Sequence, residues 1–398
     1  MWTALFAKMV NTLVKTGALK LHMADGTVIV AGDMAEPKVT VQIHDADLPR
    51  KFILNPELAL GEAYMDCGFT IVDDDLHGLL TLLIRNNNQG NQVWWQRAAY
   101  TARHFKRGFD QHNPLCTSRQ NVEHHYDLSE DFYDLFMEQD KQYTCAYFKH
   151  GDETLEQAQS NKKSHIASKL LLKPGMRVLD IGSGWGGLAI TMAQDYGVNV
   201  VGLTLSELQR QSAIKRAEAA GVADKVEFRL CDYRHLSEKF DRITAVGMME
   251  HVGQPQFRTF FRQINANLRD DGVALIHFIG RSSPPDTLSP WFQKYIFPGG
   301  YAPAMSEVIR AVEQEKLVAC DVEVWRGHYE RTLQIWQQRF QDNHDTVLEL
   351  HDERFIRMWR YYLVASELSF SEMTQVLFQL QLSKQQLAVP STRDYLYK

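Results

Sequence analysis

The chain has 398 residues, 44% of them hydrophobic, and a net charge of −6, so it is long enough for two globular domains and has no positive excess for general nucleic-acid binding. Its five cysteines are scattered without a CxxC pair, which argues against a disulfide framework or a cysteine-rich zinc site and suits a reducing cytosol. We find neither a secretory signal nor a run of roughly 18 apolar residues, so we expect a cytoplasmic protein.

The first 75 residues combine one helical pattern with several short strands. Residues 1–20 place Leu5, Met9 and Leu13 near helical spacing, which predicts an amphipathic helix. The runs "GTVIVAG", "KVTVQIHD" and "RKFILN" that follow are typical of strands. Together these patterns predict a small strand-rich or α+β unit, which ends at a polar turn or loop, "NNNQGNQ".

An aromatic and basic segment occupies residues 93–109. Trp95 and Phe105 fall on one face of a predicted helix, with Arg103 and Lys106 around it. Such a helix can lie on an anionic membrane surface, or it can pack on its own domain and expose its basic side to solvent. The segment alone does not decide between these two interpretations.

From about residue 160, strands and helices alternate regularly. Five near-continuous apolar strands, from "RVLDIGSG" to "GVALIHFIG", are separated by helical stretches such as "SELQRQSAIKRAEAAG". This alternation predicts an α/β fold with a doubly wound, mostly parallel sheet. The tail from about residue 305 is rich in Trp, Phe and Tyr, and we predict that it is mainly helical.

A glycine-rich loop lies at the start of this alternation. "VLDIGSGWGG" places Gly182, Gly184 and Gly187 in the GxGxxG register, directly after a strand and at the start of a helix. Glycines there let the backbone approach a ligand closely, and the helix N-terminus favours polar or anionic groups. A nicotinamide-binding site would carry an acidic residue at the end of the second strand to hold the ribose, and Thr204 stands in that place instead.

Three carboxylates, Asp180, Asp232 and Glu250, stand near the carboxyl ends of the predicted strands. Open α/β sheets bind ligands at this edge. Each carboxylate alone can equally be a helix cap or a loop residue. With the glycines, the three favour an adenosine and a sulfonium or amino-acid group over a pyrophosphate, an arrangement that resembles S-adenosylmethionine-dependent methyltransferases.

Seven motifs, from "EHHYDLSEDFYDLF" and "QYTCAYF" to "PWFQKYIFPGG", stand in the order and spacing of cyclopropane-fatty-acyl-phospholipid synthases. The chain resembles this family from about residue 121 into the tail, and its first hundred residues resemble the family's N-terminal lipid-binding domain. The resemblance implies a Rossmann-like class I methyltransferase sheet with a smaller N-terminal α+β lipid-binding domain. The implied boundaries are 1–110 for the lipid-binding domain, 111–125 for a linker, and 126–398 for the catalytic domain with helical acyl-pocket elements.

The resemblance also implies a reaction: a methyl group passes from S-adenosylmethionine to the cis double bond of a phospholipid acyl chain, and a bound bicarbonate ion removes a proton before the ring closes. The implied ligands of this ion are Cys145, Glu250, His277, the backbone of Ile279, and Tyr329. From the residues alone, His277 also fits a buried core histidine and Tyr329 a packed helix start. Glu250 and the histidine after it resemble a metal pair, but adjacent strand residues point to opposite faces, so no metal is predicted.

The implied S-adenosylmethionine contacts come from four segments of the chain. They are Tyr126, Tyr143 and Thr144 from the upstream segment, Gly182 and Gly184 from the glycine loop, Thr204 and Gln209 after the second strand, and Asp232 and Tyr233 near the adenine. Thr144 stands where the family usually has serine, which keeps the hydroxyl group. Tyr143 can equally pack in a lid over the site.

Two segments depart from the family pattern. "EVWRGHY" lacks the family's N-x-G stretch, and "YLVASELSF" lacks a cysteine and an arginine. These departures leave open a fatty-acyl C-methyltransferase that gives a methyl-branched or methylene chain. A small-molecule methyltransferase with an appended domain and a non-catalytic lipid-binding relative are further alternatives. We expect a homodimer that binds membrane phospholipid peripherally at the inner face of the cell membrane and binds no nucleic acid.

Overall fold

The computed structural model describes residues 1–91 and 129–397, and the chain divides into two compact units. The first unit consists of Met1–Arg107, Thr287–Pro298 and Leu333–Thr374, and the second of Gly108–Asp286, Gly299–Thr332 and Gln375–Lys398. Two stretches from the second half of the chain therefore belong to the unit that contains the N-terminus. The predicted helix over 93–109 and the predicted linker over 111–125 lie outside the described residues. No helix in the described part of the chain is long and apolar enough to cross a membrane.

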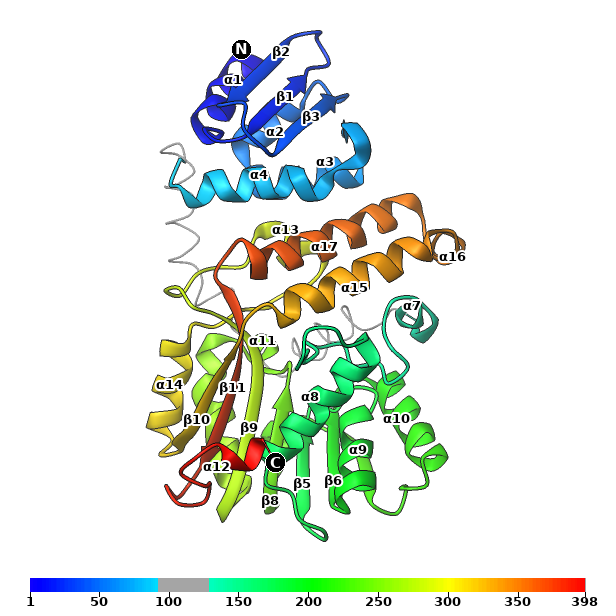
Figure 1. Ribbon diagram of the computed structural model, residues 1–398, viewed down its shortest axis with the longest axis vertical. Helices are drawn as coiled ribbons and strands as arrows, with labels where there is room; N and C mark the ends of the chain where they lie inside the picture. Colours follow the sequence, from blue (N-terminus) through cyan, green and yellow to red (C-terminus); the bar gives the residue numbers. More distant parts are fainter. Residues whose placement is uncertain (92–128, 398) are drawn as a thin grey trace. The chain divides into compact units, whose positions relative to one another are not determined.

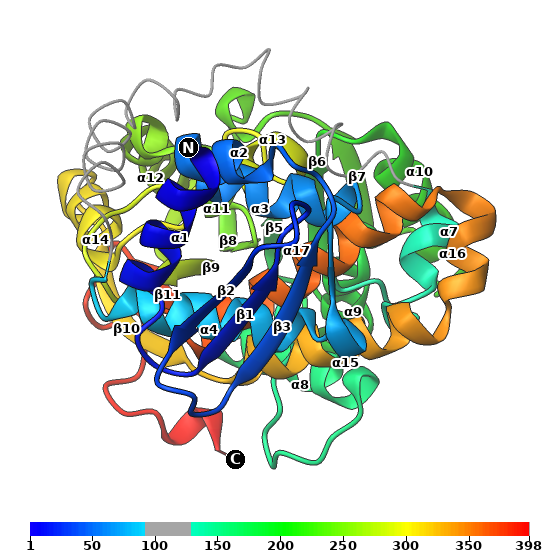
Figure 2. The same ribbon diagram turned by 90° about the horizontal axis from the view of Figure 1, so that it is seen from above.

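The N-terminal part of the first unit is a four-stranded sheet with helices, in the strand order β2-β1-β3-β4. Figure 2 shows β2, β1 and β3 side by side. The elements are α1 (Trp2–Leu13), β1 (Ala18–His22), β2 (Val28–Gly32), β3 (Lys38–Ile43), α2 (Leu48–Leu54), α3 (Pro56–Met65), β4 (Phe69–Ile71), the 3-10 turn η1 (Val72–Asp74) and α4 (Leu76–Asn88). The predicted α+β unit is confirmed. The strand predicted at "RKFILN" is wrong: the segment lies mostly in α2, where the consecutive residues Phe52 and Ile53 are both buried, as a helix face permits and one face of a strand does not.

Helices from the second half of the chain complete the first unit (Figure 1). They are α13 (Pro290–Tyr295), the C-terminal part of α15 (His328–Asp342), α16 (His344–Leu350) and α17 (Glu353–Ser371). The Trp291 ring packs directly on Gly61, where a Cβ atom would stand 2.3 Å from the indole, so only glycine fits. On α17, Glu367 accepts a 2.9 Å hydrogen bond from His77 of α4. These contacts join the late helices to the N-terminal segment.

The second unit is built on a seven-stranded sheet in the order β10-β11-β9-β8-β5-β6-β7. The strands are β5 (Arg177–Ile181), β6 (Asn199–Thr204), β7 (Val226–Leu230), β8 (Phe240–Val246), β9 (Leu268–Arg281), β10 (Val318–Trp325) and β11 (Gln375–Ser383). The five predicted strands are confirmed, and β5 to β9 pair in parallel as expected. The prediction of a mainly helical tail is incomplete, because β10 and β11 add two antiparallel strands to the edge beyond β9.

Helices cover both faces of this sheet, as in a doubly wound fold. One face carries a core that includes Phe260 and Phe261 of α12, and the other carries a core that includes Ile166 of α8 and Met192 of α9. The helices are α7 (Glu130–Asp134), α8 (Leu155–Lys169), α9 (Gly187–Tyr196), α10 (Glu207–Ala219), α11 (Met249–Val252), α12 (Phe257–Asn267) and α14 (Met305–Gln314), with 3-10 turns η2 (Tyr233–His235), η3 (Gln254–Gln256) and η4 (Asp394–Leu396). The predicted class, a Rossmann-like, mostly parallel α/β sheet, is confirmed.

Candidate active site

The glycine loop follows β5 and leads into α9. Gly182 and Gly184 have φ values of +83° and +53°, in the left-handed region that favours glycine. The backbone N–H groups of Gly182 and Ser183 both donate to the Leu203 carbonyl, at 2.9 and 2.8 Å, which ties the loop to the end of β6. A Cβ atom added to Gly184 would meet no atom within 4 Å. The loop therefore presents bare backbone to open space at the ligand-binding edge of the sheet.

The residues predicted to hold the cofactor beyond the glycine loop lie after neighbouring strands. The Thr204 hydroxyl, at the end of β6, donates to Gln209 Oε1 at 3.0 Å. After β7, the Asp232 carboxylate pairs with the Arg234 guanidinium at 2.6 Å, and Tyr233 is buried. Thr204 and Gln209 are thus already held by each other, and Asp232 is held by its own turn.

Hydrogen bonds from α8 hold the segment that contains Thr144 close to the end of β8. The Lys162 ammonium of α8 donates to Thr144 Oγ1 at 2.7 Å. From the same helix, the Gln159 amide donates to the carbonyls of Gln142 and Thr144, at 3.0 and 2.9 Å. The Thr144 methyl lies 3.0 Å from where a Cβ atom on Gly247 would stand, just beyond β8. Helix α8 thereby fixes the position of the Thr144 hydroxyl relative to the sheet.

Aromatic rings connect this segment to the glycine loop. The Tyr143 ring stands edge-on to Tyr133 with 5.4 Å between centroids, and Tyr133 packs on Trp185 of the glycine loop at 5.0 Å. Two of the predicted cofactor segments are therefore adjacent. Tyr126 lies outside the described residues.

Glu250 belongs to the short helix α11 and not to the strand predicted for it. The chain leaves β8 at Val246 and turns at Gly247, whose φ is +67°, so the argument that Glu250 and His251 point to opposite faces of a strand is wrong. Glu250 Oε1 accepts a 2.6 Å hydrogen bond from the Ile279 N–H. Its Oε2 is buried and has no hydrogen-bond partner within the described residues. Burial raises the pKa of Glu250 to about 7, so the carboxyl group is partly protonated near neutral pH.

His277 lies on β9 with 1% of its surface exposed. Its Nδ1 is 3.0 Å from the side-chain nitrogen of Gln379 on β11, and its Nε2 is buried with no partner in the described ranges 1–91 and 129–397. Burial, then the charges of Lys162 and Lys169, hold the pKa of His277 well below its usual value. The imidazole is therefore neutral at physiological pH.

Cys145 forms a small apolar cluster with Trp325 and Leu377, against which Ile279 and Tyr329 pack. The Trp325 ring also stands edge-on to His277, with 5.2 Å between centroids. Burial raises the pKa of the fully buried Cys145 thiol, so it is protonated and a poor nucleophile.

The structure thus brings the five residues predicted for the ion site together from three elements and one loop. Glu250 reaches Ile279 by a hydrogen bond, Ile279 and Tyr329 pack on the Cys145 cluster, and Trp325 of that cluster contacts His277. Two buried polar atoms in this group, one on Glu250 and one on His277, lack partners in the part of the chain that is described. Buried polar atoms normally find partners, so each of these two is open to a further hydrogen bond.

Sequence reasoning missed Lys162 and Gln379. Lys162 is fully buried beside Thr144, and burial lowers its pKa to about 8. A signal existed, because Lys162 stands at helical spacing from Leu155 and Ile166, on the apolar face of α8. Gln379 had no such signal, because its role depends on pairing with a strand about a hundred residues earlier.

The parallel sheet, the glycine loop and the polar groups at the strand ends define a Rossmann-like class I methyltransferase. Within that class, the chain belongs to the mycolic acid cyclopropane synthetase family, whose profile matches residues 114–380. Residues 2–91 match a separate domain family of unknown function, DUF7884.

Known relatives resemble the chain over most of its length. It is 36% identical to the cyclopropane-fatty-acyl-phospholipid synthase of Escherichia coli, over 86% of this chain and 87% of that protein. It is 32% identical to the tuberculostearic acid methyltransferase UfaA1 of Mycobacterium tuberculosis, over 88% of this chain and 84% of that protein. The structure of the mycolic acid cyclopropane synthase CmaA1 complexed with SAH and CTAB superposes with a TM-score of 0.64 at 30% identity, covering 69% of this chain and 99% of that one.

Proposed function

We propose that the enzyme transfers a methylene equivalent from S-adenosylmethionine to the cis double bond of unsaturated phospholipid acyl chains and forms a cyclopropane ring. The observation that carries this proposal is the 36% identity to the E. coli synthase, which extends over 86% of the chain. That span is longer than the catalytic family match alone, so the likeness reaches into the N-terminal segment as well.

The proposed cofactor site is the edge of the sheet formed by the glycine loop and the Thr144 segment. When bound, S-adenosylmethionine supplies an activated methyl group. Gly182 and Gly184 would let it approach the backbone, and the Thr144 hydroxyl, held by Lys162, would offer it a hydrogen-bonding group. The open space at Gly184 supports this fit. The roles of Tyr126, Tyr143, Thr204, Gln209, Asp232 and Tyr233 are proposed from the family resemblance alone.

In the proposed reaction, the alkene attacks the methyl group and leaves a carbocation on the acyl chain. Loss of a proton from the new methyl group then allows the ring to close. We propose that a bicarbonate ion, held by Glu250, His277, the Ile279 backbone, Tyr329 and the wall formed by Cys145, supplies the proton acceptor. The unpartnered Oε2 of Glu250 and Nε2 of His277 support such a ligand. Because the pKa of Glu250 is about 7, its protonated form can donate to an anion.

The surroundings of this ion site favour a carbocation in two ways. The cluster of Cys145, Trp325 and Leu377 is buried and apolar, so it keeps out water that would capture the cation. A neutral thiol at Cys145 also resists alkylation better than a thiolate would.

The proposed substrate lies in a membrane, so we propose that the enzyme is cytoplasmic, a homodimer, and bound peripherally to the inner face of the cell membrane. The proposed lipid-binding domain is residues 1–110. The aromatic and basic pattern of 93–109 supports membrane contact. Charge reversal at Arg103 and Lys106 should weaken binding to anionic vesicles in a salt-dependent way. An unchanged affinity at low salt would exclude this segment as the membrane contact.

A second candidate is a fatty-acyl C-methyltransferase that leaves a methyl-branched or methylene chain. It is favoured by the 32% identity to the tuberculostearic acid methyltransferase UfaA1 over 88% of the chain. Both reactions share the methyl transfer and differ in which proton the cation loses, which small shifts in base position can change.

Product analysis separates the candidates. The protein is incubated with S-adenosylmethionine and vesicles of a phospholipid with one defined cis double bond, and the fatty-acid methyl esters are analysed by mass and proton spectra. A gain of one CH₂ with loss of olefinic protons and appearance of upfield ring protons supports the synthase. The same gain with a retained alkene, in a methylene chain or an unsaturated methyl-branched chain, supports the second candidate. Unmodified lipid, with vesicle binding intact, would leave a non-catalytic lipid-binding protein.

A further inference from the structure

His277 and Gln379 face each other across two neighbouring strands at the edge of the proposed ion site. They are direct partners in the antiparallel register of β9 and β11. The Gln379 side-chain nitrogen lies 3.0 Å from His277 Nδ1, and the two residues are 0% and 1% exposed. The contact therefore forms without solvent, and the chemistry of the two groups decides which of them donates.

In this arrangement the amide N–H of Gln379 donates and His277 Nδ1 accepts. The amide oxygen of Gln379 is left without a hydrogen-bond partner among the described residues. The reversed amide would leave a buried NH₂ group without its acceptor at Nδ1, and orphaned buried N–H groups are rarer than orphaned carbonyl oxygens. The observed orientation is the less costly of the two.

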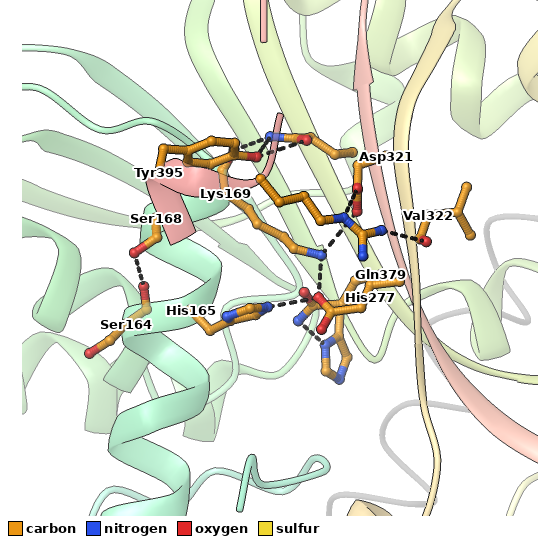
Figure 3. Close-up of polar contacts among 12 residues, drawn as sticks. Ser164, His165, Ser168, Lys169, His277, Asp321, Val322, Gln379 and Tyr395 are labelled. Atoms are coloured by element: carbon orange, nitrogen blue, oxygen red, sulfur yellow. Dashed lines mark hydrogen bonds and ion pairs between the residues drawn. The ribbon is translucent and has the colours of Figure 1, made fainter. Parts of the chain in front are cut away.

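A charged cluster lies on the Gln379 side of this contact, where Glu323 of β10 is the register partner of Gln379. Lys169 is fully buried and lies 2.5 Å from Glu323, and His165 lies 2.7 Å from the same carboxylate. Figure 3 shows Lys169 and His165 extending from one helix toward the region where Gln379 meets His277. The cluster carries both signs of charge, because the Glu323 carboxylate contacts Lys169 and His165, so the orientation of the amide rests on the hydrogen-bond argument above.

The tautomer of a neutral histidine is set by the hydrogen bond that its second nitrogen makes. Because Nδ1 of His277 accepts, its single proton sits on Nε2. That Nε2 is the atom of His277 that is buried and unpartnered in the described part of the chain. A proton there makes His277 a hydrogen-bond donor to a ligand that reaches Nε2.

We propose that Gln379 is a positioning residue that locks His277 as its Nε2–H tautomer, so that the imidazole can only donate to an anion bound in the site. This inference rests on the proposed function for its consequence, because the recipient of the Nε2–H bond is the proposed bicarbonate ion. The tautomer itself does not depend on turnover, and it can be measured in the resting protein.

The direct test is nitrogen NMR of the full chain labelled with ¹⁵N-histidine. The His277 signals are assigned among the 15 histidines by their loss in a His277→Gln variant. We expect a pyridine-type Nδ1 and a pyrrole-type Nε2 near neutral pH. In Gln379→Glu an ionised carboxylate can only accept, so Nδ1 should become pyrrole-type at a pH where that carboxyl group is ionised. A pyrrole-type Nδ1 in the unmodified protein would overturn the proposal.

The kinetic test compares two glutamines on the same strand. Gln381, two residues along β11, is also buried, but it donates to the Lys169 carbonyl and to Tyr395, away from His277. Gln379→Met should lower kcat about tenfold, because it removes one positioning hydrogen bond. The KM for S-adenosylmethionine should stay unchanged, and both tautomers of His277 should be present. Gln381→Met should leave the tautomer and kcat within about twofold of the unmodified enzyme. Equal losses in both variants would assign Gln379 a purely structural role.

The outcomes of this test and of the product analysis are distinguishable. An Nε2–H tautomer in a protein that makes no cyclopropane would support the inference and reject the proposed function. Cyclopropane formation with an Nδ1–H tautomer would do the reverse. If Gln379→Met does not fold, the spectrum of the unmodified protein still decides the inference.

Discussion

Replacing the buried Lys162 should raise the stability of the apo-protein and lower its affinity for S-adenosylmethionine. Burial lowers the pKa of Lys162 from 10.5 to about 8. At about 1.36 kcal/mol per pKa unit, this difference means that keeping the charged form in the folded protein costs roughly 3 kcal/mol at pH 7. Replacing Lys162 with methionine removes that cost and also removes the hydrogen bond to Thr144, worth about 1 kcal/mol. We therefore expect Lys162→Met to stabilise the apo-protein by about 2 kcal/mol at pH 7.

The pH dependence of stability provides the check. The folded pKa of Lys162 is lower than the unfolded one, so between about pH 8 and pH 10.5 the unfolded state binds more protons. The unmodified protein should gain stability as the pH rises through this window, and its deficit relative to Lys162→Met should disappear. Urea unfolding of both proteins at pH 7 and pH 10, followed by tryptophan fluorescence, measures the difference in unfolding free energy.

The functional effect should have the opposite sign. Without its ammonium partner, the Thr144 hydroxyl is no longer fixed, so affinity for S-adenosylmethionine should fall about tenfold. A Lys162→Met protein that is less stable than the unmodified one at pH 7, or a stability difference that is the same at pH 7 and pH 10, would refute the reasoning.

Three further predictions follow from single contacts. Glu250→Gln keeps the acceptor for the Ile279 N–H but can no longer lose or share a proton, so kcat should fall at least about a hundredfold while cofactor affinity by calorimetry stays unchanged; near-normal turnover would reject the ion site. Cys145→Ser places a hydroxyl in an apolar wall, so we expect partial activity and a loss of about 1–2 kcal/mol of stability, whereas complete loss of turnover in a folded variant would point to a direct chemical role for the thiol. The hydrogen bond to Glu367 raises the pKa of His77, so the stability that this pair contributes is present below pH 6.5 and is lost as the pH rises through the folded pKa. In unfolding experiments from pH 5.5 to 8.5, His77→Asn should remove this pH dependence. An unaltered pH profile would contradict the pairing.

Where a feature depends on a short stretch of chain, sequence reasoning located it. The strands β5 to β9 follow from apolar runs between helical patterns, and the glycine loop follows from residues that tolerate positive φ. The ion-site residues came from the order of motifs and not from local pattern. For His277, local reasoning alone also allowed a core histidine, and its burial agrees with that alternative as much as with a ligand.

Errors arose where neighbours remote in the sequence decide the outcome. "RKFILN" has strand-like residues, yet it lies mostly in α2, where Phe52 and Ile53 are buried together. Glu250 was assigned to a strand, but the chain turns at Gly247 and the Ile279 N–H holds the carboxylate from another strand. In both cases the tertiary contacts outweigh local propensity.

The sequence by itself determined the class of fold, the position of the glycine loop and the family to which the motifs belong. These follow from the spacing of hydrophobic residues, from the backbone freedom of glycine and from the order of the motifs, which are all properties of the linear sequence. Only the tertiary structure decided that β11 brings Gln379 against His277, 102 residues away, and that α8 buries Lys162 beneath Thr144. The protonation of His277, Glu250 and Lys162 depends on desolvation and on charges from distant segments. Those quantities exist only once the chain has folded, since it is folding that removes the water and sets the distances between the charges.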